Sequence, residues 1–347
     1  MRVEASTWRS KASRLASCLG VSCVGLGAAV GGLPGAAVAA DPAPARTETQ
    51  WLEAIRHAAE QQTYRGLFVY TQGDSMRTSR VVHTVQDGVP IERVQPLDGR
   101  MREYLRRGDS VECFYHDDRR VVVSQGPRGA RFPALVSAAP EDILRHYALE
   151  VEGRGRVAGN NCQLIRLTPR DDLRYGYDLC VEPASGLALK VRTRDQEGRQ
   201  IDQMAFSDVR IGEPVDASEL RPSWPAVGWT REENVAQQVD LERLGWAVSP
   251  PDGFRIERVV SRRLGEGTAK DAVREAYQAL LSDGLATVSV FIEVAAAPSF
   301  PLDVAHRHGA ASVYSRKVGT ATVTVVGEVP PETVTSIARS VEFHDPH

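Results

Sequence analysis

Turn signals recur about every ten residues between His83 and Asp118, and this spacing constrains the fold more than any other feature of the chain. The signals are Asp87-Gly88, Asp98-Gly99, Gly108-Asp109 and Asp117-Asp118. Asp-Gly pairs suit tight hairpins because glycine tolerates positive φ. Short mixed runs of apolar and charged residues lie between the turns. We therefore expect a meander of about five antiparallel strands from Met76 to Ser124.

Helices and further strands flank this meander. The stretch TETQWLEAIRHAAEQQ begins with a capping box, Thr47 with Gln50, and places Trp51 and Ile55 on one helical face. A second, short helix is expected to start at Pro140. Runs of strand residues then continue to position 212, separated by the turn sequences RDD, ASG and QEG. The region from about 45 to 212 is thus predicted to be one antiparallel β domain that carries helices.

A second, smaller α+β domain is expected near the C-terminus. The run VREAYQALLSDGLATVSVFIEVA could begin as a helix, but alternation after Asp283-Gly284 favours a hairpin about that pair. Another hairpin is expected about Gly319. The end of the chain, from Pro331, repeats apolar residues with helical spacing and predicts a terminal helix.

The division of the chain follows from these patterns. Residues 1–40 have basic residues, then an apolar run, then Ala37-Val38-Ala39, which is typical of a cleaved secretory signal peptide. An uncleaved membrane anchor is the alternative. We expect the large domain over 41–212 and a proline-rich linker with a short helical turn over 213–243. The small domain is expected over 244–345, and Trp224 and Trp229 could pack on either domain.

Charge and composition exclude one class of partner. The chain has 25% charged and 42% hydrophobic residues, as ordinary globular proteins do. Its formal charge is −3, and because residues 1–40 carry four basic residues and one acidic residue, the remainder carries about −6. Nucleic-acid binding requires clustered Lys and Arg, so we expect no nucleic-acid partner.

The standard catalytic, cofactor and metal motifs are missing from the sequence. It contains no G-x-S-x-G, H-E-x-x-H, C-x-x-C or phosphate-binding loop, so we expect neither an enzyme nor a cofactor. His306 and His308 could share a strand face, yet two histidines without a third ligand more often lie in a solvated loop, and we predict no metal site. His116-Asp117-Asp118 could form an acid–base group but is better explained as a charged loop tip.

The spacing of two cysteines is compatible with a disulfide. Cys162 and Cys180 are equidistant from Asp171, and a hairpin centred there would bring their sulfurs together in an oxidising compartment. Buried free thiols are the alternative. Cys113 is left over and is expected in the core of its strand.

Apolar residues at unusual places suggest a binding cavity. A helix-poor curved sheet has difficulty filling its interior, and larger β enclosures leave ligand cavities. Core filling is the alternative for each residue taken alone. The candidate cavity residues come from strands, from a Gly/Pro loop and from the short helix: Leu67, Val69, Tyr70, Tyr104, Phe114, Tyr115, Phe132, Leu135, Val136, Ile143, Leu144 and Tyr147.

Three stretches resemble a known family. RGRVAGNNCQLIRLTPRDDLRYGYDLCVEPASGLALKVRTRDQEGRQIDQMAF is similar to the end of the N-terminal domain of the MucB/RseB family. SDGLATVSVFIEV and TATVTVVGEVPPETVTSIARSVEF resemble its C-terminal domain. None of these motifs is catalytic, so the resemblance depends on their joint order over nearly the whole exported chain.

The resemblance implies both a fold and a function. It implies a LolA/LolB-like large domain, a curved and unclosed β-barrel with helices and an apolar cavity, beside a small α+β domain. It also implies a periplasmic protein that binds the periplasmic domain of a membrane-spanning anti-sigma factor (RseA or MucA) and shields it from regulated proteolysis. Lipid or lipoprotein ligands would release that factor during envelope stress. A lipid or lipoprotein carrier without a regulatory role is the first alternative, a secreted hydrolase is the second, and a homo-oligomer stays open.

Overall fold

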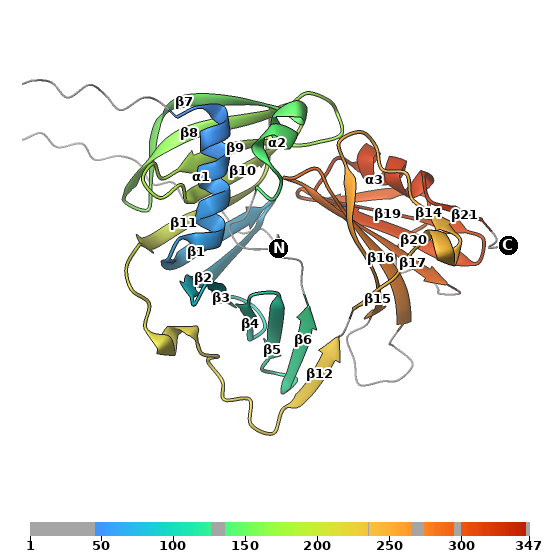
Figure 1. The fold of residues 1–347 in the computed structure, drawn as a ribbon, viewed down its shortest axis with the longest axis horizontal. Helices are drawn as coiled ribbons and strands as arrows, with labels where there is room; N and C mark the ends of the chain where they lie inside the picture. The colour runs from blue at the N-terminus through green and yellow to red at the C-terminus, as the bar shows by residue number, and fades with distance from the viewer. Residues whose placement is uncertain (1–45, 126–135, 235, 265–273, 295–299, 345–347) are drawn as a thin grey trace, which may run out of the picture. The chain divides into compact units, whose positions relative to one another are not determined.

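The computed structural model describes residues 46–125, 136–234, 236–264, 274–294 and 300–344. The expected signal peptide therefore lies outside the described residues, as do Phe132 and Leu135. Within the described ranges, most of the chain belongs to a 12-stranded sheet and a 7-stranded sheet, with three α-helices beside them (Figure 1). In that part of the chain, no helix is long and apolar enough to cross a membrane.

The large sheet has the strand order β12-β6-β5-β4-β3-β2-β1-β11-β10-β9-β8-β7. All neighbours pair antiparallel except β12 and β6, which are parallel. Its strands are β1 (Tyr64–Gln72), β2 (Ser75–Gln86), β3 (Val89–Pro96), β4 (Arg102–Arg107), β5 (Ser110–Tyr115), β6 (Arg120–Gln125), β7 (Tyr147–Val157), β8 (Asn160–Pro169), β9 (Gly176–Val181), β10 (Ala188–Arg194), β11 (Gln200–Ile211) and β12 (Thr230–Asn234). The predicted five-stranded meander is confirmed as β2–β6, and Gly88, Gly99 and Gly108 have positive φ in its turns.

The small sheet has the order β13-β15-β16-β17-β20-β19-β18. Its strands are β13 (Gln237–Gln238), β15 (Arg255–Leu264), β16 (Arg274–Ser282), β17 (Thr287–Val294), β18 (Ala305–His308), β19 (Ala311–Val318) and β20 (Ala321–Gly327). A separate pair joins β14 (Trp246–Ala247) to β21 (Glu342–Phe343). The hairpins about Asp283-Gly284 and Gly319 are confirmed, and the helical alternative for the first half of that run is wrong, because β16 pairs with both β15 and β17.

In the described ranges, three α-helices pack against the sheets. Helix α1 (Glu48–Gln61) begins with the predicted capping box, in which the Thr47 hydroxyl accepts from the Gln50 N–H and the Gln50 side chain accepts from the Thr47 N–H. Helix α2 is Pro140–His146 and helix α3 is Pro331–Arg339, so both proline-started helices are confirmed. Figure 1 shows α1 lying across the strands of the large sheet near β8–β11 and α3 beside the small sheet.

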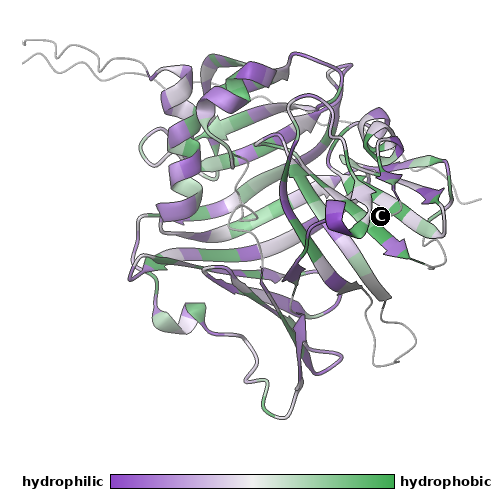
Figure 2. Cartoon of the chain, turned by 45° about the vertical axis from the view of Figure 1, so that its right-hand side comes forward, coloured by the Kyte–Doolittle hydropathy of each residue, from purple (hydrophilic) through white to green (hydrophobic). Residues whose placement is uncertain are grey.

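Alternation along the strands separates buried from solvated faces. In Figure 2, hydrophobic and hydrophilic residues alternate along many strands of both sheets. The small sheet and α3 enclose one apolar cluster, which includes Val288, Val290, Val325 and Ile337. The large sheet has three clusters, two of which include residues of α1. Each strand can bury one face in such a cluster because successive side chains along a strand point to opposite faces of the sheet.

The fold class is confirmed as α+β with mainly antiparallel, unclosed sheets. In the large sheet, β12 and β7 are the two edges and do not pair with each other. The region expected as a linker, 213–243, contains the predicted helical turn as the 3₁₀ helix η1 (Ala217–Leu220). It also contributes β12 to the large sheet and β13 to the small one. The boundaries at 40, 212 and 243 stay predictions.

Candidate functional site

Four of the predicted cavity residues lie together beneath helix α1. Val136, Ile143 and Tyr147 are buried, and Leu144 packs against the same cluster. Trp51 and other residues of α1, together with residues of β7, β8 and β9, complete this cluster. The helix therefore occupies this part of the apolar interior.

The predicted residues of β1 lie on both faces of the strand. Tyr70 packs against the cluster that contains Phe68 and Phe206, and its hydroxyl donates to Asp202 Oδ2 at 3.0 Å. Burial, and then the charge of Asp202, raises the pKa of Tyr70, so its hydroxyl stays protonated and acts as a donor. Leu67 and Val69 alternate with these positions, point to the opposite face and are half-buried.

The predicted residues of the meander do not converge with those beneath α1. Phe114 is buried with Val82, Leu105 and Leu220 in a separate cluster. Tyr104 and Tyr115 are half-buried, and the Arg120 guanidinium lies 4.8 Å from the centre of the Tyr115 ring. The described candidates thus belong to separate apolar clusters and strand faces, and the ligand cavity stays a prediction.

The segment expected to be a proline-rich linker, with Trp224 and Trp229 packing on either domain, packs on the meander. We call residues 213–229 the strap. Leu220, Trp224 and Trp229 of the strap pack against the cluster of Phe114, so the two tryptophans belong to the large sheet. The ring of His116 lies 4.9 Å from that of Trp224. The His116-Asp117-Asp118 turn is therefore a packing and ion-pairing feature, because both aspartates also pair with Arg100.

A buried ion pair anchors the strap. Arg93 and Glu103 form an ion pair between diagonal positions of neighbouring strands β3 and β4, and the Glu103 side chain is fully buried. The N–H of Ser223 donates to Glu103 Oε2 at 3.0 Å, and Arg93 Nη1 donates to the Glu219 carbonyl at 3.0 Å. The strap thus supplies the remaining hydrogen bonds that a buried charge pair requires.

A second buried polar group joins the two sheets, and we call it the junction. Asp283, in the turn between β16 and β17, accepts from the Tyr147 hydroxyl at 3.0 Å and from Arg174 Nε at 2.8 Å. The side chains of Arg174 and Asp283 are both 0% exposed. Arg174 also pairs with Asp171 and donates through Nη2 to the Asp252 carbonyl at 2.6 Å. Burial, and then the charge of Asp283, raises the pKa of Tyr147 well above its ordinary value.

Two glycines make the junction sterically possible. Gly253 and Gly284 have φ of +81° and +99°, a region that favours glycine. A Cβ on Gly253 would clash with the Arg174 guanidinium, and one on Gly284 would clash with Ala138. Ser137 fixes the same turn, because its N–H donates to the Gly284 carbonyl at 2.8 Å.

Sequence reasoning missed the polar role of the junction. It described Asp283-Gly284 as a turn and Tyr147 as an apolar cavity residue. The partner of Asp283 is Arg174, 109 positions away, and no local pattern connects the two. A pocket of about 530 Å³ lies beside the junction and has a charged lining that includes Asp142, Arg145, His146 and Arg255. Such a lining suits polar contacts with a polypeptide better than acyl chains.

The cysteines and histidines have structural surroundings. Cys162 and Cys180 form a disulfide between β8 and β9, with their Cα atoms 5.3 Å apart. Cys113 is free and half-buried, so it is less buried than a core residue. His306 and His308 lie on exposed β18. Among the described residues, no group of three or more His, Cys, Asp or Glu side chains converges as metal ligands would.

Two family models cover most of the chain. The model of the MucB/RseB N-terminal domain matches residues 47–224, and that of the MucB/RseB C-terminal domain matches residues 240–342. The Sigma-E factor regulatory protein RseB of Haemophilus influenzae is 28% identical over 299 residues, which cover 85% of this chain and 90% of that protein. The Sigma factor AlgU regulatory protein MucB of Pseudomonas aeruginosa is 28% identical over 322 residues, covering 89% and 95%.

A solved structure agrees with this relationship. The crystal structure of MucB in complex with MucA(peri) superposes with a TM-score of 0.65 at 26% identity, over 86% of this chain and 99% of that one. A crystal structure of MucB alone gives a TM-score of 0.62 at 25% identity. Sequence and structure agree across both sheets, and this chain belongs to the MucB/RseB family.

Proposed function

We propose that this chain is a periplasmic regulator that binds the periplasmic domain of an anti-sigma factor and shields it from regulated proteolysis. The observation that carries the proposal is the match to MucB in complex with MucA(peri), which spans 99% of that chain. Relatives named as regulators of sigma-E and of AlgU support the same role. The signal-like sequence of residues 1–40 supports export.

The site supports binding rather than catalysis. The polar groups of the junction are saturated by one another, and the His116 turn is held by two tryptophans and Arg100. Groups with such partners suit a structural role, because a catalytic base must reach a substrate proton. We therefore propose that the chain is not an enzyme.

Release by a lipid or lipoprotein is the finer part of the proposal. Three exposed apolar side chains support it, because they lie at one end of the meander: Met76 (67% exposed), Leu97 (45%) and Met101 (49%). The half-buried Leu67, Val69, Tyr104 and Tyr115 offer further apolar surface on the same sheet. An acyl chain contributes roughly 0.8 kcal/mol per buried methylene, so occupancy of such a surface could outweigh a modest protein interface.

The test is a protease-protection assay with purified components. The exported chain is mixed with the periplasmic domain of the anti-sigma factor from the same genome, and site-1 protease is added. We expect cleavage to be slowed at least tenfold, and restored when lipid or lipoprotein is added. A scrambled periplasmic domain is the control. Binding without protection would contradict the regulatory proposal.

Two further measurements separate the alternatives. A lipid carrier would bind lipid but leave the anti-sigma segment unbound in a pull-down. Cell fractionation should place the chain in the periplasm. Light scattering of the exported chain, alone and with the segment, decides whether a homo-oligomer forms.

A further inference from the structure

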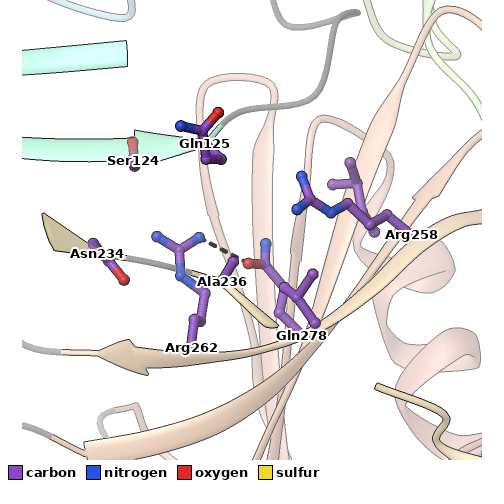
Figure 3. Close-up of a pocket in the computed structure, with 9 residues that line it drawn as sticks. Ser124, Gln125, Asn234, Ala236, Arg258, Arg262 and Gln278 are labelled. Carbon is purple, nitrogen blue, oxygen red and sulfur yellow. Dashed lines mark hydrogen bonds between the residues drawn. The ribbon is translucent and has the colours of Figure 1, made fainter. Parts of the chain in front are cut away.

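A small pocket lies where β6 and β12 of the large sheet approach β15 and β16 of the small one. Its volume is about 100 Å³. Ser124 and Gln125 line it from the end of β6, and Asn234 lines it from the end of β12. Arg258 and Arg262 of β15 and Gln278 of β16 form the other side (Figure 3). This pocket is distinct from the junction and from the apolar clusters.

Strand geometry directs both arginines to one face. Arg258 and Arg262 are four residues apart on β15, so they project from the same side of the sheet. Gln278 lies opposite Val260 in the register of β15 and β16, between the two arginines. Figure 3 shows both guanidinium groups pointing toward the Gln278 amide.

The amide of Gln278 has a fixed orientation. Its Oε1 accepts from Arg262 Nη1 at 2.8 Å, and its Nε2 donates to Ser289 Oγ at 3.0 Å. The buried Nε of Arg262 has no hydrogen-bond partner among the described residues. A preorganised guanidinium therefore keeps a donor unused.

The positive charge in the pocket lacks a counter-charge in the described part of the chain. Arginines of β6 and β12 that do not line the pocket have carboxylate partners, Arg120 with Glu232 and Arg231 with Glu112. No carboxylate of the described residues pairs with Arg258 or Arg262. Burial, and then the nearby charge of Arg258, lowers the pKa of Arg262, which shows that its charged form is held at a cost. An anion bound between the two guanidinium groups would offset their mutual repulsion and stabilise the charged form of Arg262.

We infer that this pocket binds one carboxylate, from an Asp or Glu side chain of the partner polypeptide. The planar fork of an arginine matches a carboxylate in two parallel hydrogen bonds. A volume of about 100 Å³ holds one small group but no acyl chain, which favours a polypeptide side chain over a lipid. This inference rests on the proposed function, because it names a contact of the same partner.

The first test needs no partner protein. The exported chain with ¹⁵N-labelled arginine is titrated with acetate, with inorganic phosphate and with chloride at equal ionic strength, and the Arg Nε–H resonances are followed. We expect one resonance, absent from Arg262→Gln, to shift and saturate with acetate but not with chloride. Saturation with phosphate alone would contradict the assignment of a carboxylate as the ligand. Saturation with neither anion would contradict the inference that the pocket binds an anion.

The second test uses the periplasmic domain of the anti-sigma factor. Arg262→Gln and Arg258→Gln should each weaken binding about tenfold or more, which corresponds to about 1.4 kcal/mol. Arg243→Gln is the matched control, since its side chain is 88% exposed, and it should change affinity less than twofold. Thermal unfolding of each variant checks folding, and Arg262→Lys, which keeps the charge, should retain more affinity than Arg262→Gln.

A double-mutant cycle identifies the carboxylate. Each Asp and Glu of the partner domain is replaced by Asn or Gln. At one position of the partner domain, the substitution should weaken binding to the unsubstituted chain about tenfold. The same substitution should not weaken binding to Arg262→Gln any further. Unchanged binding by Arg262→Gln would overturn the pocket and leave the proposed function intact. If the unsubstituted chain does not bind the periplasmic domain, the proposed function is wrong. The acetate titration still tests whether the pocket binds a carboxylate.

Discussion

Cys113 shows how the surroundings of one side chain set its chemistry. The thiol is half-buried on β5, and burial raises its pKa to about 11 although Arg102 and Arg106 act in the opposite direction. Only the thiolate reacts with alkylating reagents. A thiol with a raised pKa is therefore protected at neutral pH even where reagent can reach it.

In the folded chain without residues 1–40, we expect the rate of alkylation of Cys113 to rise about tenfold per pH unit from pH 7 to 10 without levelling. In urea the rate of alkylation of the same thiol should stop rising above about pH 9, since an unperturbed cysteine has a pKa of about 8.5. Reaction at pH 8 should be on the order of 100-fold slower in the folded chain. Mass spectrometry measures both rates, with Cys113→Ser as the blank. A folded-state plateau near pH 9 would contradict the assignment.

Residue pairs differ in how well their contact can be predicted from the sequence. The spacing of Cys162 and Cys180 about a turn contains enough information to suggest that they meet, because hairpin partners are close in sequence. Arg174 and Asp283 meet across 109 positions, and nothing in RDDLR or in SDG identifies the partner. A polar residue with a distant partner is indistinguishable in sequence from a residue of an ordinary turn.

Among the elements too, some could be predicted from local sequence and others, such as the strap, could not. Helices α1 and α3 were predictable from caps, prolines and spacing, and the meander from its turns. The strap has little periodicity and several prolines, features typical of a linker. Its packing depends on Leu220, Trp224 and Trp229 meeting side chains of β2–β6, which are distant in the sequence. The described cavity candidates belong to different clusters for a related reason. Alternation along a strand predicts which face a side chain lies on, but not which other element packs on that face.

The strap offers a matched pair of substitutions. Leu220 is 2% exposed and Val227 is 83% exposed on the same segment. We expect Leu220→Ala to lower the free energy of unfolding by about 2–5 kcal/mol, since it leaves a cavity. Val227→Ala should change it by less than about 0.5 kcal/mol. Urea unfolding followed by circular dichroism measures both. Equal, small effects would mean that the strap packs loosely and acts as a linker after all.

At the scale of the molecule, the junction connects two apolar cores that the sequence separates. Trp51 belongs to a core of the large sheet and Trp246 to that of the small sheet. Each core has its own helix and could unfold by itself. A fully buried pair such as Arg174 and Asp283 opposes this, because separating the sheets would leave Asp283 without its charged partner and Arg174 with Asp171 alone. The junction should therefore make the two cores unfold together.

This coupling can be measured with two single-tryptophan proteins. One retains Trp51 and the other Trp246, with phenylalanine at the remaining tryptophans. We expect their urea transitions to coincide, as two-state unfolding requires. Asp283→Ala removes one of the two carboxylates that pair with buried Arg174 and also the acceptor of the Tyr147 hydroxyl, so it should lower the free energy of unfolding by about 3–5 kcal/mol and separate the two transitions. Glu197→Ala breaks the exposed pair of Glu197 with Arg199 and should cost less than about 1 kcal/mol, with the transitions still coincident. Coincident and unshifted transitions in Asp283→Ala would show that the sheets are coupled by something other than this ion pair.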